Sequence, residues 1–342
     1  MSYIKTLIIA AILINIMAAG CGVDKPAGGW PSYTVAVVNH GFTDHYFPVA
    51  INNKGDVLFN VADPDTVNSS YLWSKGKVTA LGGLGYKYGQ VLDPPMAVND
   101  ATTIARAMND KGQIVGQSVT NKGYTHAFLW ENGKMIDLGT LGGKTSRAMG
   151  INNKGQVVGG TEDTKGSYRP FIWDKVQGMR ELGKGLDEGN AISINDKGQV
   201  IGQTIRGEFY LFHNGKITPT TDTRNYSPRA INNKGEIAGV ADGVYVCKQG
   251  KWTKIKLDYF DDACRISGIK DNGLVTGCGT YEYSLTGFLY QNGTSIGIEK
   301  LTTKEPGWQF MGIIPLANDK GQILMLGFLN GKKHMAVLTP VK

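Results

Sequence analysis

Residues 146–183 read SRAMGINNKGQVVGGTEDTKGSYRPFIWDKVQGMRELG, and this stretch decides the fold. Its apolar and β-branched runs are short and are separated by turn residues, which predicts an antiparallel meander of four strands. The strands are expected at Ala148–Ile151, Gln156–Gly160, Pro170–Trp173 and Met179–Leu182. Asn152 and Gly155 suit the first and fourth positions of a type I turn, with Gly155 in the left-handed conformation. One such meander cannot bury both of its faces, so it must stack on copies of itself.

The copies are recognisable by the same turn, which recurs along the chain in variants of INNKG. Its glycine stands at Gly55, Gly112, Gly155, Gly198, Gly235, Gly273 and Gly321. Successive copies are 57, 43, 43, 37, 38 and 48 residues apart. Four strands repeated at a period of about 40–50 residues are typical of β-propeller blades. The chain of 342 residues is therefore predicted to be all-β, a seven-bladed β-propeller of four-stranded antiparallel blades.

The two ends of the repeat array complement each other. A strand expected at Tyr33–Asn39 precedes the first full repeat, and the last repeat has a third strand at His334–Leu338 but no fourth. The N-terminal strand is therefore predicted to pair beside His334–Leu338 and close the ring, which removes the exposed edges of an open stack. Residues 33–342 would then form one propeller domain.

The first twenty residues differ in composition from the repeats. Lys5 precedes the apolar run Leu7–Met17, and the small residues Ala18–Gly20 come directly before Cys21. This order predicts an export signal over residues 1–20, whose apolar run is too short to favour a spanning helix. The small residues before Cys21 resemble the bacterial lipobox, and that resemblance implies cleavage before Cys21 and attachment of lipid to it. An ordinary signal cleaved nearby, with Cys21 unmodified, is the alternative. Residues 21–32 would form a tether.

Blade two carries the motif HAFLW at His126–Trp130, followed by LGTLGG at Leu138–Gly143. With the recurrent INNKGQVVG pattern, these motifs resemble the HAF-repeat family, a family of bacterial repeat proteins taken to be extracellular. The resemblance implies a repeat fold and an extracellular setting, and it implies no particular activity. Blade three departs from the motif with Arg169 at the His position, and blade five reads Tyr245-Val246-Cys247. Because bulky apolar residues persist at these positions, they are predicted to pack between blades.

In such a meander, the first and third turns of every blade lie on one face of the ring. That face is predicted to carry thirteen lysines: Lys54, Lys75, Lys77, Lys111, Lys134, Lys154, Lys175, Lys197, Lys216, Lys234, Lys248, Lys251 and Lys320. We call it the lysine face. The formal net charge of +7 falls to +6 when Lys5 is removed with the signal. Solvated turns and a functional basic face explain the lysines equally well, and export argues against nucleic acid as the partner. Since Tyr33 starts on this face, a lipid at Cys21 would hold it toward a membrane.

Familiar catalytic motifs do not occur in the sequence: it has no GxSxG, no HExxH, no Walker loop and no paired CxxC. No catalytic residue is therefore assigned, and no cofactor or metal is expected. His126 and His334 occupy equivalent strand starts, which favours structural roles. His40 and His45 share a loop with Asp44, where solvation is favoured over metal binding. The sequence leaves open whether Cys264 and Cys278 form a disulfide.

The loops that depart most from the repeat lie on the opposite face, where blades six, seven, one and two are consecutive. They span residues 39–47, 82–104 and 302–309, together with the second turn of blade one. The candidate ligand-binding residues are Phe42, Asp44, His45, Tyr46, Asp63, Asp65, Tyr86, Tyr88 and Trp308. Aromatic rings with carboxylates suit a glycan or peptide ligand. Each residue taken alone is better explained as an anchor of its own loop, and their clustering strengthens the case for a shared site.

The sequence thus predicts an exported, lipid-anchored propeller that acts as a binding or scaffold module at the cell envelope. We expect a monomer joined to the membrane through Cys21, in the outer membrane of a Gram-negative organism and otherwise at the cell surface or outside the cell. A propeller enzyme acting on polysaccharide or another extracellular substrate, with acidic residues in the same sector, is the alternative. A purely structural surface protein is a third reading, because propeller folds host many functions.

Overall fold

The computed structural model describes residues 30–42, 45–62, 69–85, 103–183, 186, 188–219, 226–257, 265–281, 284–301, 307–310 and 315–341. The predicted signal, Cys21 and most of the tether lie outside the described residues. The described chain is built almost wholly of β-strands, and its α-helix is the single turn α1 (Ile298–Leu301). None of the helical structure in this part of the chain is long and apolar enough to cross a membrane.

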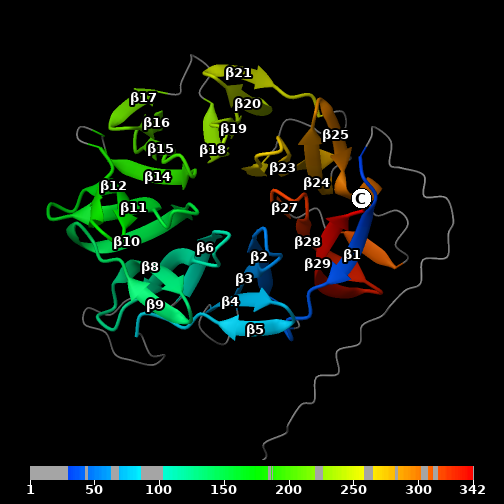
Figure 1. Ribbon diagram of the computed structural model, residues 1–342, viewed down its shortest axis with the longest axis horizontal. Helices are drawn as coiled ribbons and strands as arrows, with labels where there is room; N and C mark the ends of the chain where they lie inside the picture. Colours follow the sequence, from blue (N-terminus) through cyan, green and yellow to red (C-terminus); the bar gives the residue numbers. More distant parts are fainter. Residues whose placement is uncertain are drawn as a thin grey trace, which may run out of the picture.

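Seven antiparallel sheets stand around a central axis as the blades of a ring, as Figure 1 shows. Blade one contains β2 (Tyr46–Ile51), β3 (Val57–Val61), β4 (Ser69–Ser74) and β5 (Lys77–Ala80). Blade two contains β6 (Thr103–Met108), β7 (Ile114–Val119), β8 (Thr125–Glu131) and β9 (Lys134–Asp137). Blade three contains β10 (Gly142–Ile151), β11 (Val157–Asp163), β12 (Tyr168–Asp174) and β13 (Gly178–Glu181). The seven-bladed all-β prediction is confirmed.

The next three blades repeat the same order of four strands. Blade four contains β14 (Gly189–Ile194), β15 (Val200–Thr204), β16 (Phe209–His213) and β17 (Lys216–Pro219). Blade five contains β18 (Ser227–Ile231), β19 (Ile237–Val240), β20 (Val244–Lys248) and β21 (Lys251–Lys254). Blade six contains β22 (Arg265–Ile269), β23 (Val275–Tyr281), β24 (Ser284–Gln291) and β25 (Thr294–Gly297).

Blade seven joins the two ends of the chain. Its inner position is shared by β26 (Trp308–Phe310) and β27 (Leu316–Ala317), followed by β28 (Ile323–Leu329) and β29 (Lys332–Pro340). Its outer strand is β1 (Tyr33–Val37), which pairs antiparallel with β29 from Tyr33 opposite Pro340 to Val37 opposite Ala336. Beyond this pairing, the Val341 N–H donates to the Ser32 carbonyl at 2.8 Å. The predicted closure of the ring by the N-terminal strand is confirmed.

The first turn of each blade has the predicted geometry. In blade three Gly155 has a φ of +83°, and its N–H donates to the carbonyl of Asn152 at 3.0 Å. The preceding strand contains a bulge between Ala148 and Gly150. Next to this bulge, the Arg147 carbonyl lies close to the second strand. A Cβ added to Gly159 would be 2.0 Å from the carbonyl oxygen of Arg147. The second strand of blade three therefore needs glycine at this position, whereas blades one and seven carry Phe59 and Met325 there.

Apolar side chains fill the spaces between neighbouring blades, and the described residues form a hydrophobic cluster at each of the seven interfaces. Phe128, Phe171 and Phe288 stand at the phenylalanine position of the HAFLW motif and are fully buried. Their predicted packing role is confirmed. Trp30 also belongs to this core, because it is 4% exposed and packs between blades six and seven. Trp30 thus packs into the core although it lies within the predicted tether of residues 21–32.

Candidate functional site

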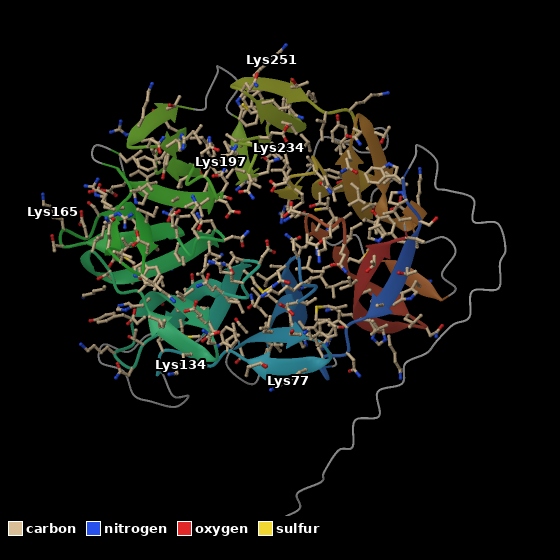
Figure 2. The ribbon with its side chains drawn as sticks, viewed as in Figure 1. Lys77, Lys134, Lys165, Lys197, Lys234 and Lys251 are labelled. Atoms are coloured by element: carbon tan, nitrogen blue, oxygen red, sulfur yellow. The ribbon has the colours of Figure 1, made fainter. Side chains whose placement is uncertain are left out.

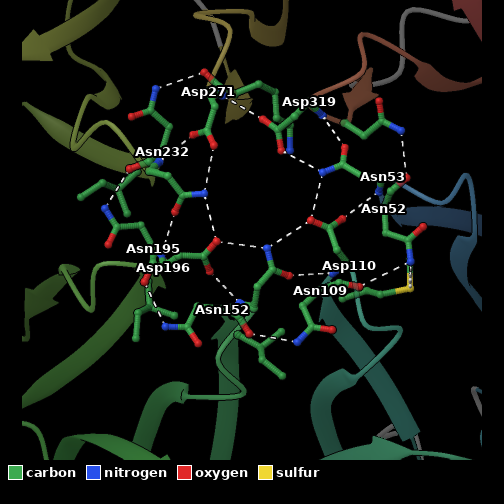
Figure 3. A pocket seen from close by; sticks show the side chains of 18 of the residues that line it. Asn52, Asn53, Asn109, Asp110, Asn152, Asn195, Asp196, Asn232, Asp271 and Asp319 are labelled. Carbon is green, nitrogen blue, oxygen red and sulfur yellow. Dashed lines mark hydrogen bonds between the residues drawn. The ribbon is translucent and has the colours of Figure 1, made fainter.

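A ring of polar side chains surrounds the propeller axis at the level of the first turns (Figure 3). Every blade contributes the residue at the second position of its INNKG-like turn. In order around the ring these are Asn53, Asp110, Asn153, Asp196, Asn233, Asp271 and Asp319. Amide and carboxylate thus alternate until the last pair. Because Asn supplies donors and Asp supplies acceptors, each Asn–Asp contact can form a complete hydrogen bond.

The backbone continues the same circle. The N–H of each second-position residue donates to the side-chain Oδ1 of its counterpart in the next blade, over distances of 2.7 to 2.9 Å. The seventh bond runs from Asp319 back to Asn53, so the circle closes without a gap. Side-chain bonds reinforce it: the Asp110 Oδ2 accepts from Asn53 at 2.9 Å and from Asn153 at 3.1 Å. The ring therefore links each blade to both of its neighbours.

The first-position asparagines form a second, buried layer of contacts. In blade three the Asn152 Oδ1 accepts the N–H groups of Lys154 and Gln156, each at 3.0 Å, and so holds its own turn. Its Nδ2 donates at 3.0 Å to the carbonyl of Asn195 in blade four. Five other blades make the equivalent bond, donated by Asn52, Asn109, Asn195, Asn232 and Asn318. We call the two layers together the interblade clasp.

Blade six departs from this pattern at Lys270, which stands where the other blades have the first-position asparagine. Asn and Asp cannot alternate strictly around a closed ring of seven positions. The alternation fails at blade six, where Asp271 is followed by Asp319, and Lys270 stands in this same blade. Burial lowers the pKa of Lys270, and Asp319, Asp110 and Asp271 act in the opposite direction. The Asp271 Oδ2 accepts one side-chain amide, from Asn233 at 3.0 Å, whereas Asp110 accepts two. A lysine beside the adjacent acids offsets the missing donor.

The cavity inside the clasp has a volume of about 180 Å³ and is lined by these asparagines, aspartates and Lys270. Ordinary ligand pockets are larger, at roughly 300 Å³ or more. The described side-chain amides and carboxylates that line the cavity also form hydrogen bonds with one another. The geometry therefore supports a structural role for the clasp, which fixes the register of the blades.

The thirteen residues of the lysine face are all exposed. First-turn residues such as Lys197 and Lys234 lie near the axis, and third-turn residues such as Lys134 and Lys251 lie at the rim (Figure 2). Within the described residues, the ion pairs of this face are Lys175 with Glu131 and Lys248 with Glu236. The remaining eleven lysines form no ion pair in that part of the structure.

The predicted ligand site on the opposite face is only partly within the described residues. Asp44, Asp63, Asp65, Tyr86 and Tyr88 lie outside them, so their contribution stays a prediction. The described members are Phe42, His45, Tyr46 and Trp308.

Tyr46 is fully buried, with Lys333 4.7 Å above its ring, and its assignment as a ligand contact is wrong. It was read as a loop residue, but it is the first residue of β2 and its ring fills the space between blades seven and one. Phe42 packs against the same cluster, with its ring 4.7 Å from that of Tyr71. Trp308 packs beside blades six and seven. Only His45 among the described members is exposed.

His40 lies in the same aromatic cluster and is 8% exposed. Its Nδ1 accepts the N–H of Phe42 at 3.1 Å, which requires that nitrogen to be unprotonated. Burial, His334 and Lys333 lower the pKa of His40 to about 4. His40 is thus a neutral core residue that orients the loop from Asn39, and it was not recognised as one from the sequence.

The remaining polar predictions have simple outcomes. His126 lies 2.9 Å from Asp137 across β8 and β9, in line with a structural role. Cys247 and Cys278 are free and buried. Cys264 lies outside the described residues, so the Cys264–Cys278 disulfide that the sequence left open is not tested. Among the described residues, no group of three or more His, Cys, Asp or Glu side chains is placed to hold a metal ion.

No protein-family model and no curated protein matches this sequence. The fold is similar to the β-propeller domain of the Trilobed protease from Pyrococcus furiosus, with a TM-score of 0.56 and 12% identity over 87% of this chain and 97% of that one. It is also similar to virginiamycin B lyase from Staphylococcus aureus, with a TM-score of 0.51 and 14% identity over 90% and 100% of the two chains. A third similar structure is YCF48 bound to D1 peptide, with a TM-score of 0.51 and 11% identity over 95% and 100%. The chain is a β-propeller, and at these identities the likeness extends to the fold alone. The HAF-repeat resemblance stays a prediction.

Proposed function

We propose that this chain is an exported, lipid-anchored β-propeller that acts as a binding module at the cell envelope and rests its lysine face on an anionic surface. The observation that carries the proposal is the lysine face itself. Thirteen exposed lysines project from one side of a rigid ring, and within the described residues only two of them meet a carboxylate. Each lysine near an anionic membrane adds up to about 1 kcal/mol of attraction.

The start of the fold supports this orientation. Tyr33 pairs with Pro340, at the end of β1 that lies on the lysine face. Cys21 precedes the buried Trp30 by nine residues. Even a fully extended segment of that length spans only about 30 Å. A lipid on Cys21 would therefore keep the lysine face close to the membrane.

The opposite face would then point toward the surroundings and receive the ligand. A glycan or a peptide fits the aromatic and acidic residues predicted in its loops. His45 is exposed there. Phe42, three residues earlier in the chain, and Trp308, in the neighbouring blade seven, are partly buried. Screening the chain against glycan and peptide arrays, followed by turnover assays on any hit, separates a binding module from an enzyme.

Vesicle flotation tests the electrostatic part of the proposal. A Cys21→Ser chain should bind phosphatidylcholine vesicles containing phosphatidylserine more tightly than pure phosphatidylcholine vesicles, and added salt should weaken that binding. The triple variant Lys77→Glu, Lys134→Glu, Lys216→Glu should lose roughly tenfold or more in affinity. Lys122→Glu, Lys165→Glu is the control, because these exposed lysines lie in second turns on the opposite face. Equal losses in the two variants would contradict the proposal.

A further inference from the structure

A cavity of about 440 Å³ opens on the lysine face between blades five and six. Its volume falls within the usual range of small-molecule pockets, roughly 300–1,000 Å³. The described members of the predicted ligand site, Phe42, His45, Tyr46 and Trp308, are not among the residues that line it. The cavity is therefore a second candidate site, separate from the clasp and from the loops considered above.

The cavity exists because blade five carries small residues where other blades carry large ones. The paired positions on β19 and β20 that face blade six are Ala238 and Val246. The equivalent pair in blade two is Val115 and Leu129, which fills the interface with blade three. Blade five therefore leaves space where blade two packs tightly.

On the blade-six side of the cavity, the aromatic side chain is also smaller than the one at the equivalent position of blade three. Blade six contributes Tyr290, opposite Val275, where blade three contributes Trp173 opposite Val157. Tyr290 is only partly buried. A partly exposed aromatic ring at the side of a pocket offers an apolar surface and a hydroxyl to a bound molecule.

The mouth of the cavity is positively charged. Lys234, Lys248 and Lys251 line it together with one acid, Glu236. Burial acts to raise the pKa of Glu236, but hydrogen bonds from Lys248 and Asn232 lower it, so this carboxylate is ionised and already paired. Lys234 and Lys251, labelled on blade five in Figure 2, form no ion pair among the described residues, although Lys234 also helps to lower the pKa of Glu236. The four side chains leave a charge of +2 at the mouth.

The floor of the cavity is apolar. Val246, Ile255 and Ile269 line it and are 6%, 7% and 5% exposed. A ligand that suits both parts must combine a doubly charged anionic group with a compact carbon body. A phosphate monoester carries a charge of about −1.5 to −2 at neutral pH, which matches the charge at the mouth. Lysine ammonium groups are common phosphate ligands.

We propose that the cavity between blades five and six binds a phosphate monoester on a compact carbon body, such as a sugar phosphate. Lys234 and Lys251 contact the phosphate, and the carbon body lies against Tyr290 and the apolar floor. The same chemistry is present in a soluble sugar phosphate and in a membrane lipid whose headgroup is a phosphate monoester. The proposal goes beyond the envelope function and does not require the lipid on Cys21.

Isothermal titration of the full chain with glucose 6-phosphate, and with glucose as the neutral control, tests the phosphate requirement. Binding should be measurable for glucose 6-phosphate and absent for glucose. The Lys234→Ala, Lys251→Ala variant should weaken it by roughly tenfold or more, since it removes both unpaired charges. The matched control is Lys111→Ala, Lys134→Ala, which deletes the same two turn lysines from blade two, where the larger Val115 and Leu129 pack against blade three.

A second variant separates the cavity from general surface charge. Val246→Phe fills the floor and leaves every lysine in place, so it should also abolish binding while the melting temperature shows that the ring is intact. Binding that survives Val246→Phe, or that falls equally in the blade-two control, would overturn the proposal.

Vesicles distinguish the two sources of the phosphate. Phosphatidylcholine vesicles with 10 mol % phosphatidic acid present phosphate monoesters, whereas vesicles with 10 mol % phosphatidylserine present a diester and a carboxylate. These compositions are about equal in anionic lipid content. A lipid ligand predicts that Lys234→Ala, Lys251→Ala loses more binding to the phosphatidic acid vesicles than the blade-two control does. A soluble ligand predicts binding of glucose 6-phosphate without that difference. If neither probe distinguishes the two variants, the proposal is wrong.

Discussion

Replacing Asn152 by alanine tests whether the interblade clasp stabilises the ring. The Asn152 side chain is 3% exposed and takes part in four hydrogen bonds. Two are accepted from Lys154 and Gln156 N–H groups, one is donated to Gln156 at 2.8 Å and one crosses to the Asn195 carbonyl at 3.0 Å. At a net contribution of about 1 kcal/mol each, and with water replacing the part-buried bond to the N–H of Lys154, an exposed residue, the loss in unfolding free energy is about 3 kcal/mol.

For a ring of about 310 residues, an unfolding entropy near 2.1 cal/mol/K per residue converts that loss into a decrease of about 5 °C in melting temperature. Denaturant unfolding and calorimetry measure both values. Lys154→Ala is the control in the same turn, because its side chain is exposed, and it should change the unfolding free energy by less than about 0.5 kcal/mol. A loss below about 1 kcal/mol for Asn152→Ala would refute the clasp as a stabilising element.

Three further predictions concern His40, the pairing of β1 with β29, and Cys21. Lowering the pH from 6.5 to 4 should reduce the unfolding free energy of the wild-type chain by about 3 kcal/mol more than that of His40→Asn, because the unfolded chain takes up a proton that the buried, low-pKa His40 does not; identical pH profiles in urea unfolding would contradict this. Deleting Tyr33–Val37 should expose the β29 edge and lower the melting temperature by many degrees, and an unchanged thermal transition would show that β1 does not secure the ring. Cys21→Ser should move the protein from membrane to soluble fractions, and intact mass measurement of an unmodified wild-type Cys21 would rule out the lipid anchor.

The repeats made the architecture predictable because local and global signals agree in them. The Asn152 to Gly155 turn, the strand after it and the period of the copies all indicate the same four-stranded unit. Ring closure was predictable because the strand surplus at Tyr33–Asn39 matches the deficit after His334–Leu338. Both arguments need only the order of strands along the chain.

The clasp could not be predicted in this way, because its bonds join residues about forty positions apart. Asn153 reads locally as a turn residue, and nothing in its own turn shows that it contacts Asp110 and Asp196. A signal was nevertheless present, since the second turn position alternates between Asn and Asp around the ring. Only the geometry of a closed ring gives that alternation its meaning.

The predicted ligand site was less secure because loop boundaries decide which aromatic rings are free. Tyr46 was assigned to a loop, but strand β2 begins at this residue and places its ring inward. The sequence signal for the cavity between blades five and six is a difference in side-chain size between equivalent positions of two blades. It appears only when Ala238 and Val246 are compared with their larger counterparts, Val115 and Leu129, in blade two.

Amine footprinting of the membrane-bound protein tests the central claim, that the lysine face rests on the membrane. A water-soluble amine reagent modifies exposed lysines, and mass spectrometry compares their rates on vesicles and in free solution. Lys77, Lys134 and Lys216 should react several-fold more slowly on vesicles, whereas Lys122 and Lys165 on the opposite face should react at equal rates in both states. Protection of Lys122 and Lys165, or equal reactivity of all five lysines in both states, would contradict the proposed orientation.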